Sequence, residues 1–335
     1  MATDWVRAAE TLVDEVLEPG TAEVDRVGRI PDTAFDTMAE RGFYGFALTE
    51  GMTPDVLIDT AATVISGCLA TGFVWAQHLG ALRSVAFAEN AALRDRYLEP
   101  MRAGQFRCGV SYAGAVDPPS LFADPVDYGF VLRGVAPFVT GWGYIDAVIA
   151  AVRVFIDGTE SIATLLIPVS DVDESAVRPV PLIAADASRT VQVTFDGGRV
   201  ESASMLGIRP VAEFLAARGS LADWVNGALG LGVLARCVRQ LEELGVDSSA
   251  HEALFKELRS RFPGAAGNAD ATYALRADIA RAALDTAAAG VVATGSRATL
   301  SGSTPERLMR QATFALVCTT REQIKDALLD RLAVR

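Results

Sequence analysis

Residues 129–154 read GFVLRGVAPFVTGWGYIDAVIAAVRV, and this stretch is the strongest indication of how the chain folds. It is rich in β-branched and aromatic residues and lacks apolar residues at helical spacing, which predicts two β-strands. Gly141-Trp142-Gly143 separates them; the glycines allow the backbone angles of a tight turn, and Trp142 can cover the rim of a sheet. We therefore expect a strand pair near the centre of the chain.

The region around this pair, from Phe106 to about Leu206, has the same character. Further strands are predicted in SIATLLIPV (161–169), VRPVPLIA (177–184) and TVQVTFDG (190–197). Asp157-Gly158 and Asp196-Gly197-Gly198 are typical turn sequences between strands. Short strands at this spacing, with no helices between them, predict a small antiparallel sheet pair or β-barrel.

Helical spacing dominates both ends of the chain. Residues 55–90, DVLIDTAATVISGCLATGFVWAQHLGALRSVAFAEN, are apolar almost all round, as in a helical segment buried on every side. After Gly207 alanine- and glycine-rich helical segments return, which suits closely packed helices. The chain is therefore predicted to be an α+β multidomain protein with an all-α domain at 1–109, a central antiparallel β-barrel at 110–206 and a C-terminal four-helix-type bundle at 207–335.

Composition excludes several classes of function. The net charge of −12 and the pI near 4.7 argue against nucleic acid or an anionic membrane surface as partner. Four scattered cysteines and two histidines offer no metal-binding pattern and suggest reduced thiols. We see no signal peptide and no apolar run long enough to span a membrane, so we expect a cytoplasmic protein.

Five stretches in this α–β–α order resemble the acyl-CoA dehydrogenase superfamily. They are VDRVGRIPDTAFDTMAERGFYGFAL (24–48), HLGALRSVAFAENAALRDRYLEPMRAGQFRCGVSY (78–112), the strand pair at 129–154, VTFDGGRVESASMLG (193–207) and PERLMRQATFALVCTTREQIKDALL (305–329). The resemblance covers nearly the whole chain. It implies a flavoprotein with FAD rather than FMN, acting on acyl-CoA or an acyl-carrier thioester.

The resemblance also implies which residues contact the flavin: Val110, Ser111, Phe138, Thr140 and Trp142. A flavin ring needs a flat apolar wall and hydrogen-bond donors at its edge, which aromatic and hydroxyl side chains supply. The alternative interpretation is an ordinary strand end and turn. Two cofactor-binding segments of the family have no clear counterpart in this sequence. The stretches most similar to them are Arg261-Phe262-Pro263-Gly264 and Gly295-Ser296-Arg297-Ala298.

The catalytic base is the main departure from the family. Acyl-CoA dehydrogenases use a Glu to remove a proton from the substrate, and Thr319 stands at its usual position. Threonine cannot act as a base at neutral pH. Asp223 and Glu322 are the candidate replacements, but Thr319-x-x-Glu322 also has the form of a helix capping box, which we favour for both residues.

Other polar residues have simpler interpretations. His78 lies in the apolar helical segment and is expected to be a buried structural donor. Arg307 and Arg310, three apart on one helix, have the spacing to fix a carboxylate or phosphate, although a structural role is favoured.

Three functions remain open. The first is α,β-dehydrogenation of an acyl thioester with a relocated or partner-supplied base. The second is a flavin-dependent monooxygenase of the same fold, and the third is a non-catalytic subunit of a mixed oligomer. The family further implies a homodimer, a homotetramer or a hetero-oligomer with a related subunit.

Overall fold

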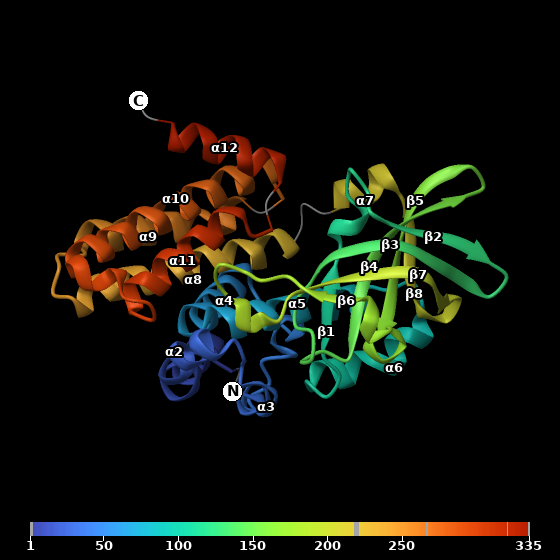
Figure 1. Cartoon of the computed structure of the whole chain (residues 1–335), viewed down its shortest axis with the longest axis horizontal. Helices are drawn as coiled ribbons and strands as arrows, with labels where there is room; N and C mark the ends of the chain where they lie inside the picture. Colours follow the sequence, from blue (N-terminus) through green and yellow to red (C-terminus); the bar gives the residue numbers. More distant parts are fainter. Residues whose placement is uncertain (1–2, 218–220, 266, 320, 334–335) are drawn as a thin grey trace.

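The computed structural model describes residues 3–217, 221–265, 267–319 and 321–333, and it leaves undescribed the side chains of 217 and 221–225. Figure 1 shows a group of N-terminal helices in contact with a C-terminal helical bundle, and a sheet domain beside them. The predicted order of helices, strands and helices is confirmed. The expected domain limits at 109 and 206 stay a prediction.

The N-terminal part is helical throughout. Its helices are α1 (Trp5–Leu12), the π-helical turn η1 (Val13–Leu17), α2 (Glu18–Val27), α3 (Asp32–Glu40), α4 (Pro54–Gly67), α5 (Leu69–Ala86) and α6 (Ala91–Arg102). Side-chain caps start several of them: Asp4 accepts the amide of Arg7, and Asn90 accepts the amide of Leu93. These caps satisfy first-turn amides that have no partner within the helix.

The apolar run at 55–90 forms two helices rather than one. Cys68 has extended backbone angles, with φ −152° and ψ 109°, and it separates α4 from α5. Most residues of α5 are buried, as the sequence predicts. Gly72 permits the break, because a Cβ there would lie 2.9 Å from the Cα of Ile65 in the preceding helix.

The central part is one eight-stranded sheet. Its strands are β1 (Cys108–Ser111), β2 (Leu121–Val126), β3 (Gly129–Val139), β4 (Ala147–Ile156), β5 (Thr159–Pro168), β6 (Val177–Pro179), β7 (Val191–Glu201) and β8 (Met205–Pro210). The strand order is β6-β7-β3-β2-β4-β5-β8, and β1 pairs with β4. The predicted pair at 129–154 therefore consists of β3 and β4, which are not neighbours because β2 lies between them.

The expected antiparallel barrel is wrong in two respects. The sheet is mixed, since β1 and β2 both run parallel to β4, and among the described strands it stays open, with β6 and β8 at its two ends. Parallel neighbours require crossover connections, and a strand pattern of period two does not reveal which neighbour each strand takes. The expected strand at 177–184 is also shorter, and β6 ends at Pro179.

The C-terminal part contains α7 (Val211–Ala217), α8 (Leu221–Glu243), α9 (Ser249–Arg261), α10 (Ala269–Thr294), α11 (Thr304–Val317) and α12 (Glu322–Leu332). Small residues let its helices pack closely on the N-terminal ones. A Cβ on Gly232 of α8 would lie 2.6 Å from the carbonyl oxygen of Ala62 on α4. Replacing this glycine would force α4 and α8 apart.

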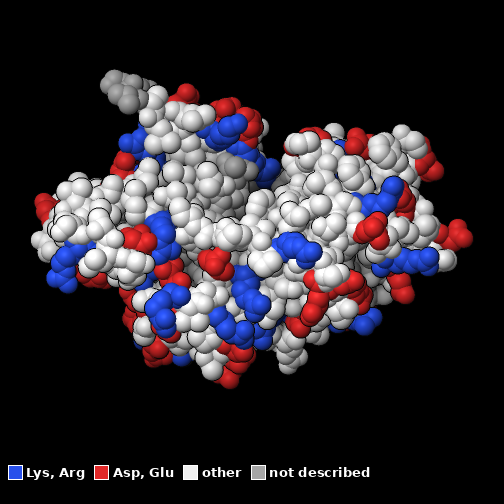
Figure 2. Space-filling model, in the orientation of Figure 1, with Lys and Arg blue, Asp and Glu red and all other residues white. Residues whose placement is uncertain are grey.

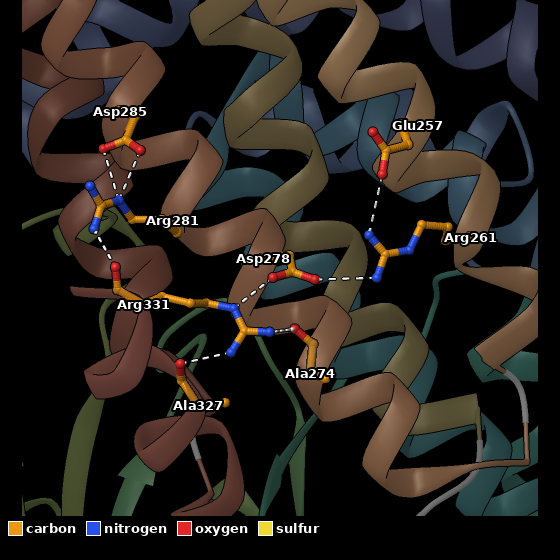
Figure 3. A network of polar contacts seen from close by, with 8 residues as sticks. All are labelled: Glu257, Arg261, Ala274, Asp278, Arg281, Asp285, Ala327 and Arg331. Atoms are coloured by element: carbon orange, nitrogen blue, oxygen red, sulfur yellow. Dashed lines mark hydrogen bonds and ion pairs between the residues drawn. The ribbon is translucent and has the colours of Figure 1, made fainter. Parts of the chain in front are cut away.

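Ion pairs join the outer helices of the bundle (Figure 3). Asp278 of α10 binds Arg331 of α12 at 2.6 Å and Arg261 of α9 at 3.3 Å. Arg281 binds Asp285 on the same helix and also donates to the main-chain oxygen of Arg331. These contacts fix α12 along α10.

The surface carries charges of both signs. In the view of Figure 2 they are interspersed, and the surface is hollowed between the bundle and the sheet domain. No helix in the described part of the chain has the length and hydropathy needed to cross a membrane.

Candidate functional site

Three of the predicted flavin-contacting residues lie where α5, β1 and the turn after β3 meet. A Cβ on Gly109 of β1 would lie 2.8 Å from the carbonyl oxygen of Thr140, and one on Gly80 of α5 would lie 3.8 Å from Val110. The turn itself packs on α5, because a Cβ on Gly141 would lie 3.2 Å from Val74. The structure therefore brings Val110, Ser111 and Thr140 to one junction.

Ser111 has a buried hydroxyl with no partner. It is the last residue of β1 and lies opposite Ala150 of β4. Its exposed fraction is 1%, and within the described residues its Oγ makes no hydrogen bond. Because buried polar groups are almost always paired, this hydroxyl is suited to form a hydrogen bond with a bound ligand.

Thr140 ends a chain of three buried hydroxyls. Its Oγ1 lies 3.0 Å from Oγ1 of Thr190, which in turn lies 3.0 Å from Oγ of Ser188. Three hydroxyl protons share these two contacts, so one proton at an end of the chain is left to bind something else. Thr140 is thus able to donate a hydrogen bond into the junction.

Main-chain contacts hold the turn after β3. The amide of Gly141 donates to the oxygen of Ser188 at 2.9 Å, and that of Trp142 donates to the oxygen of Arg189 at 3.2 Å. Tyr144 accepts the amide of Ile30 and donates to the oxygen of Ala187. Burial raises the pKa of Tyr144, so its hydroxyl keeps its proton for this structural bond.

The two predicted aromatic residues lie differently. Trp142 is half-buried and packs against the core of the sheet. Phe138 is 53% exposed, at an irregularity in the pairing of β3 with β7 between Ala136 and Val139. An extra residue at such a bulge turns a side chain away from its regular face.

Arg153, which was not among the predicted site residues, fixes the loop that follows β1. It is 2% exposed on β4, and its Nε donates to the oxygen of Ala115 at 2.6 Å. Its two terminal nitrogens bind Glu160 at 2.8 Å and Asp117 at 2.6 Å. An arginine inside an otherwise apolar strand is the sequence signal that would have found it.

The turn between α11 and α12 holds Thr319, the residue at the expected position of the catalytic base. Thr319 has a left-handed φ of +55°, which is strained for a β-branched residue. Arg276 of α10, which is 7% exposed, donates to its hydroxyl at 2.7 Å and to its carbonyl oxygen at 3.1 Å. The guanidinium thus holds the turn in its unusual conformation and places positive charge there.

The predicted capping box is wrong. The N-cap of α12 is Arg321, not Thr319, and its side chain makes no capping hydrogen bond. Glu322 lies in the first turn of α12, is 71% exposed and forms an ion pair with Lys325 at 2.9 Å. Thr319 is bonded by Arg276 instead, which is far away in the sequence and absent from any local motif.

Asp223, the other candidate base, lies on α8, but its side chain falls outside the described residues. Asn226, one turn further along α8, lines a small cavity together with Arg276, Cys318 and Ile324. The start of α8 and the α11–α12 turn therefore border the same space. In Figure 1, α12 starts at the end of the bundle nearest the sheet domain.

His78 has a structural role, as expected. Its Nε2 bonds the oxygen of Met101 at 3.1 Å, and its Nδ1 accepts the amide of Cys108 at 3.2 Å. Burial lowers the pKa of His78 to about 3, so the ring stays neutral. Among the residues that the structure describes, no group of three His, Cys, Asp or Glu side chains is placed to hold a metal ion.

No protein-family model and no curated protein matches the sequence. The fold, however, matches many solved structures. Butyryl-CoA dehydrogenase from Megasphaera elsdenii has a TM-score of 0.83 at 12% identity, over 97% of this chain and 95% of that one. The FAD complex of PigA has a TM-score of 0.82 at 14% identity, over 98% and 97%.

An enzyme with another activity is also similar. Dibenzothiophene monooxygenase (TdsC) from Paenibacillus sp. A11-2 has a TM-score of 0.76 at 15% identity, over 98% of this chain and 95% of that one. These matches confirm the fold that the sequence resemblance implied. The chain has the fold of the acyl-CoA dehydrogenase superfamily.

Proposed function

We propose that the protein is a flavin-dependent oxidoreductase that removes hydrogen from an acyl thioester. The observation that carries this proposal is the pair of hydroxyls at the α5–β1 junction. Ser111 is buried without a partner, and Thr140 ends a hydroxyl chain with one proton to spare. Both are suited to donate to the nitrogen and oxygen atoms at the edge of a flavin ring.

The residues present fit this cofactor. Ser111 and Thr140 would hold the edge of the ring, Val110 would contribute apolar surface, and Trp142 would support the turn that carries Thr140. The loop fixed by Arg153 lies directly after Ser111 and keeps β1 in place. When bound, the flavin, which we propose is FAD, would accept hydride from the substrate.

Thr319 and Glu322 are poorly suited to act as the base that a dehydrogenase reaction needs. Thr319 cannot take a proton, and the guanidinium of Arg276 beside it would favour a negative ligand over a proton. Glu322 forms an ion pair with Lys325 and is largely exposed to solvent. We therefore favour Asp223, whose helix borders the same cavity as the α11–α12 turn, as the residue that removes the proton.

Anaerobic titration with acyl-CoA thioesters of increasing chain length tests the proposal. Bleaching of the flavin absorbance is expected with at least one chain length. Asp223→Asn should slow bleaching by roughly 100-fold or more, as for the loss of a general base. Glu322→Gln is the matched control and should bleach at the wild-type rate; equal rates for wild type and Asp223→Asn would exclude Asp223.

A second candidate is a flavin-dependent monooxygenase of the same fold. The observation that favours it is the positive charge of Arg276 at the turn where a dehydrogenase carries its carboxylate. A flavin that no thioester bleaches, together with oxygen consumption when a flavin reductase is supplied, would support this candidate over the first.

The acyl group is carried either by coenzyme A or by a protein-bound pantetheine. Repeating the titration with both kinds of thioester shows which of them bleaches the flavin. The cytoplasmic location and the homo- or hetero-oligomeric state stay predictions.

A further inference from the structure

The hydroxyls of Thr140, Thr190 and Ser188 form a buried chain that starts at the α5–β1 junction. Thr140 directly follows β3 and Thr190 directly precedes β7, next to the paired residues Val139 and Val191. Oγ1 of Thr140 lies 3.0 Å from Oγ1 of Thr190, which lies 3.0 Å from Oγ of Ser188. The exposed fractions of the three residues are 4%, 4% and 0%. Thr140 lies at the junction end of this hydroxyl chain, and Ser188 lies at its inner end.

Main-chain hydrogen bonds already hold the segment that carries Ser188 and Thr190. The oxygen of Ser188 accepts the amide of Gly141 at 2.9 Å, and the oxygen of Thr190 accepts the amide of Val180 at 3.0 Å. A valine in place of Thr190 would have nearly the same shape and would bury no polar group, whose burial is costly unless it is hydrogen-bonded. The segment is therefore held in place without the hydroxyl chain.

The inner end of the hydroxyl chain is closed. Among the described residues, Oγ of Ser188 makes no hydrogen bond except with Thr190. The neighbouring Ala185 and Ala187 belong to the apolar core that the segment shares with the helices. A proton of Ser188 or Thr190 that turned away from the hydroxyl chain would lose its acceptor in the interior, which is unfavourable. The favoured arrangement is therefore the one in which Ser188 donates to Thr190 and Thr190 donates to Thr140.

This arrangement makes Thr140 a donor toward the junction. Its oxygen accepts the proton of Thr190, so its own proton is left for a ligand. A hydroxyl that accepts one hydrogen bond also donates a stronger one, because the bonds in such a chain polarise one another. The oxidised flavin ring has nitrogen and oxygen acceptors along its edge, which match a donor at this place.

We propose that Thr190 and Ser188 are positioning residues for the cofactor, which keep Thr140 a hydrogen-bond donor toward the flavin ring and strengthen its bond. This inference rests on the proposed function, since it takes FAD to be the ligand at the junction. Neither residue was among the predicted cofactor contacts. Part of the affinity for oxidised FAD thus comes from two hydroxyls that act through a third.

A double-mutant cycle on FAD affinity tests the proposal. Fluorescence titration of the whole chain with FAD gives the dissociation constant of each variant. Thr140→Val should weaken binding by about tenfold, the effect of one hydrogen bond. Thr190→Val should weaken it by roughly threefold, because Thr140 loses the bond that polarises it. In the Thr140→Val background, Thr190→Val should have no further effect, because its influence passes through the hydroxyl of Thr140.

Two controls separate this role from a structural one. Thr190→Ser keeps the hydroxyl and should bind FAD as tightly as the wild type. Thr272→Val removes another buried hydroxyl, which donates to the oxygen of Ala265 at 3.0 Å in the C-terminal part, and it should leave FAD affinity unchanged whatever its stability. If Thr190→Val does not fold, Ser188→Ala takes its place in the same cycle with Thr140→Val.

Failure of the inference and failure of the proposed function give different results. A wild-type protein that binds no FAD would overturn the proposed function, and the inference with it. If the wild type binds FAD, three results would overturn the inference alone. They are an unchanged affinity in Thr190→Val, an equal loss from Thr190→Val with and without the hydroxyl of Thr140, and a Thr190→Ser variant that binds as weakly as Thr190→Val.

Discussion

Nη2 of Arg276 lies 2.7 Å from Oγ1 of Thr319, so a buried guanidinium on α10 holds the hydroxyl at the turn between α11 and α12. This turn is where an acyl-CoA dehydrogenase is expected to carry its base. The contact places a positive charge where a negatively charged carboxylate is expected. A cation there stabilises a bound anion and disfavours the binding of a proton.

The first prediction concerns Thr319→Glu. We expect the new carboxylate to pair with Arg276 and to have a pKa below its usual value, which makes it a poor base. The pair should stabilise the fold above the unfolded pKa of about 4.3, and this stabilisation should be lost as the pH falls through the lower folded pKa. Urea unfolding at pH 7 and pH 3 measures it. Thr319→Gln is the control, and an identical pH dependence in both variants would contradict the prediction.

The second prediction tests whether Ser111 binds the flavin or is an ordinary buried serine. Ser111→Ala removes an unpaired hydroxyl, so the apoprotein should be unchanged or more stable by up to about 1 kcal/mol. The same change should weaken flavin binding by about tenfold, the effect of one hydrogen bond. Urea unfolding and fluorescence titration with FAD measure the two effects.

Ser120→Ala is the matched control for Ser111. Its hydroxyl donates to the oxygen of Val135 at 2.9 Å, so its removal should destabilise the apoprotein. If Ser111→Ala destabilises the apoprotein as much as Ser120→Ala and leaves FAD affinity intact, Ser111 has no role toward a flavin.

The third prediction concerns Arg153. Arg153→Met breaks three hydrogen bonds, including the one to the oxygen of Ala115, and should lower the free energy of unfolding by about 2 kcal/mol. Arg133→Met removes an exposed ion pair with Asp124 and should change stability by less than about 1 kcal/mol. Equal effects in a urea titration would show that Arg153 does not fix the loop after β1.

The fourth prediction concerns the pH dependence of stability. The pKa of His78 is about 3 in the folded protein because the ring is buried, and about 6.5 when unfolded. Between these values only the unfolded chain takes up the proton, so stability should fall as the pH is lowered from about 6.5, by up to about 1.4 kcal/mol per pH unit.

His78→Gln should remove this component and flatten the curve between pH 6.5 and pH 5, although the variant is less stable at pH 7. A slope that His78→Gln retains would show that the ring is protonated in the folded state.

The sequence was sufficient for the order of helices and strands and for the presence of two strands within 129–154, of which the second, β4, begins at Ala147 and ends at Ile156. It did not reveal that β1 and β2 run parallel to β4, because side-chain alternation is the same in both orientations. It also did not reveal the break of the long apolar run at Cys68, which depends on how α4 and α5 pack.

The candidate site, like the fold, was predicted from the sequence only in part. Ser111 and Thr140 were predicted from the resemblance to the family, and the structure brings both to the junction with α5, where their role toward a flavin stays a prediction. Thr190, Arg153 and Arg276 were missed, since each acts through a partner that is distant in sequence. The capping box at Thr319 failed for the same reason, because a tertiary contact with Arg276 replaced a local one.

The visible spectrum of the purified protein shows whether this fold holds a flavin. We expect a yellow protein, or an apoprotein that binds added FAD stoichiometrically and acquires the absorbance of a bound flavin. A protein that is colourless as purified and stays colourless after incubation with FAD and gel filtration would contradict it, and would favour a non-catalytic subunit.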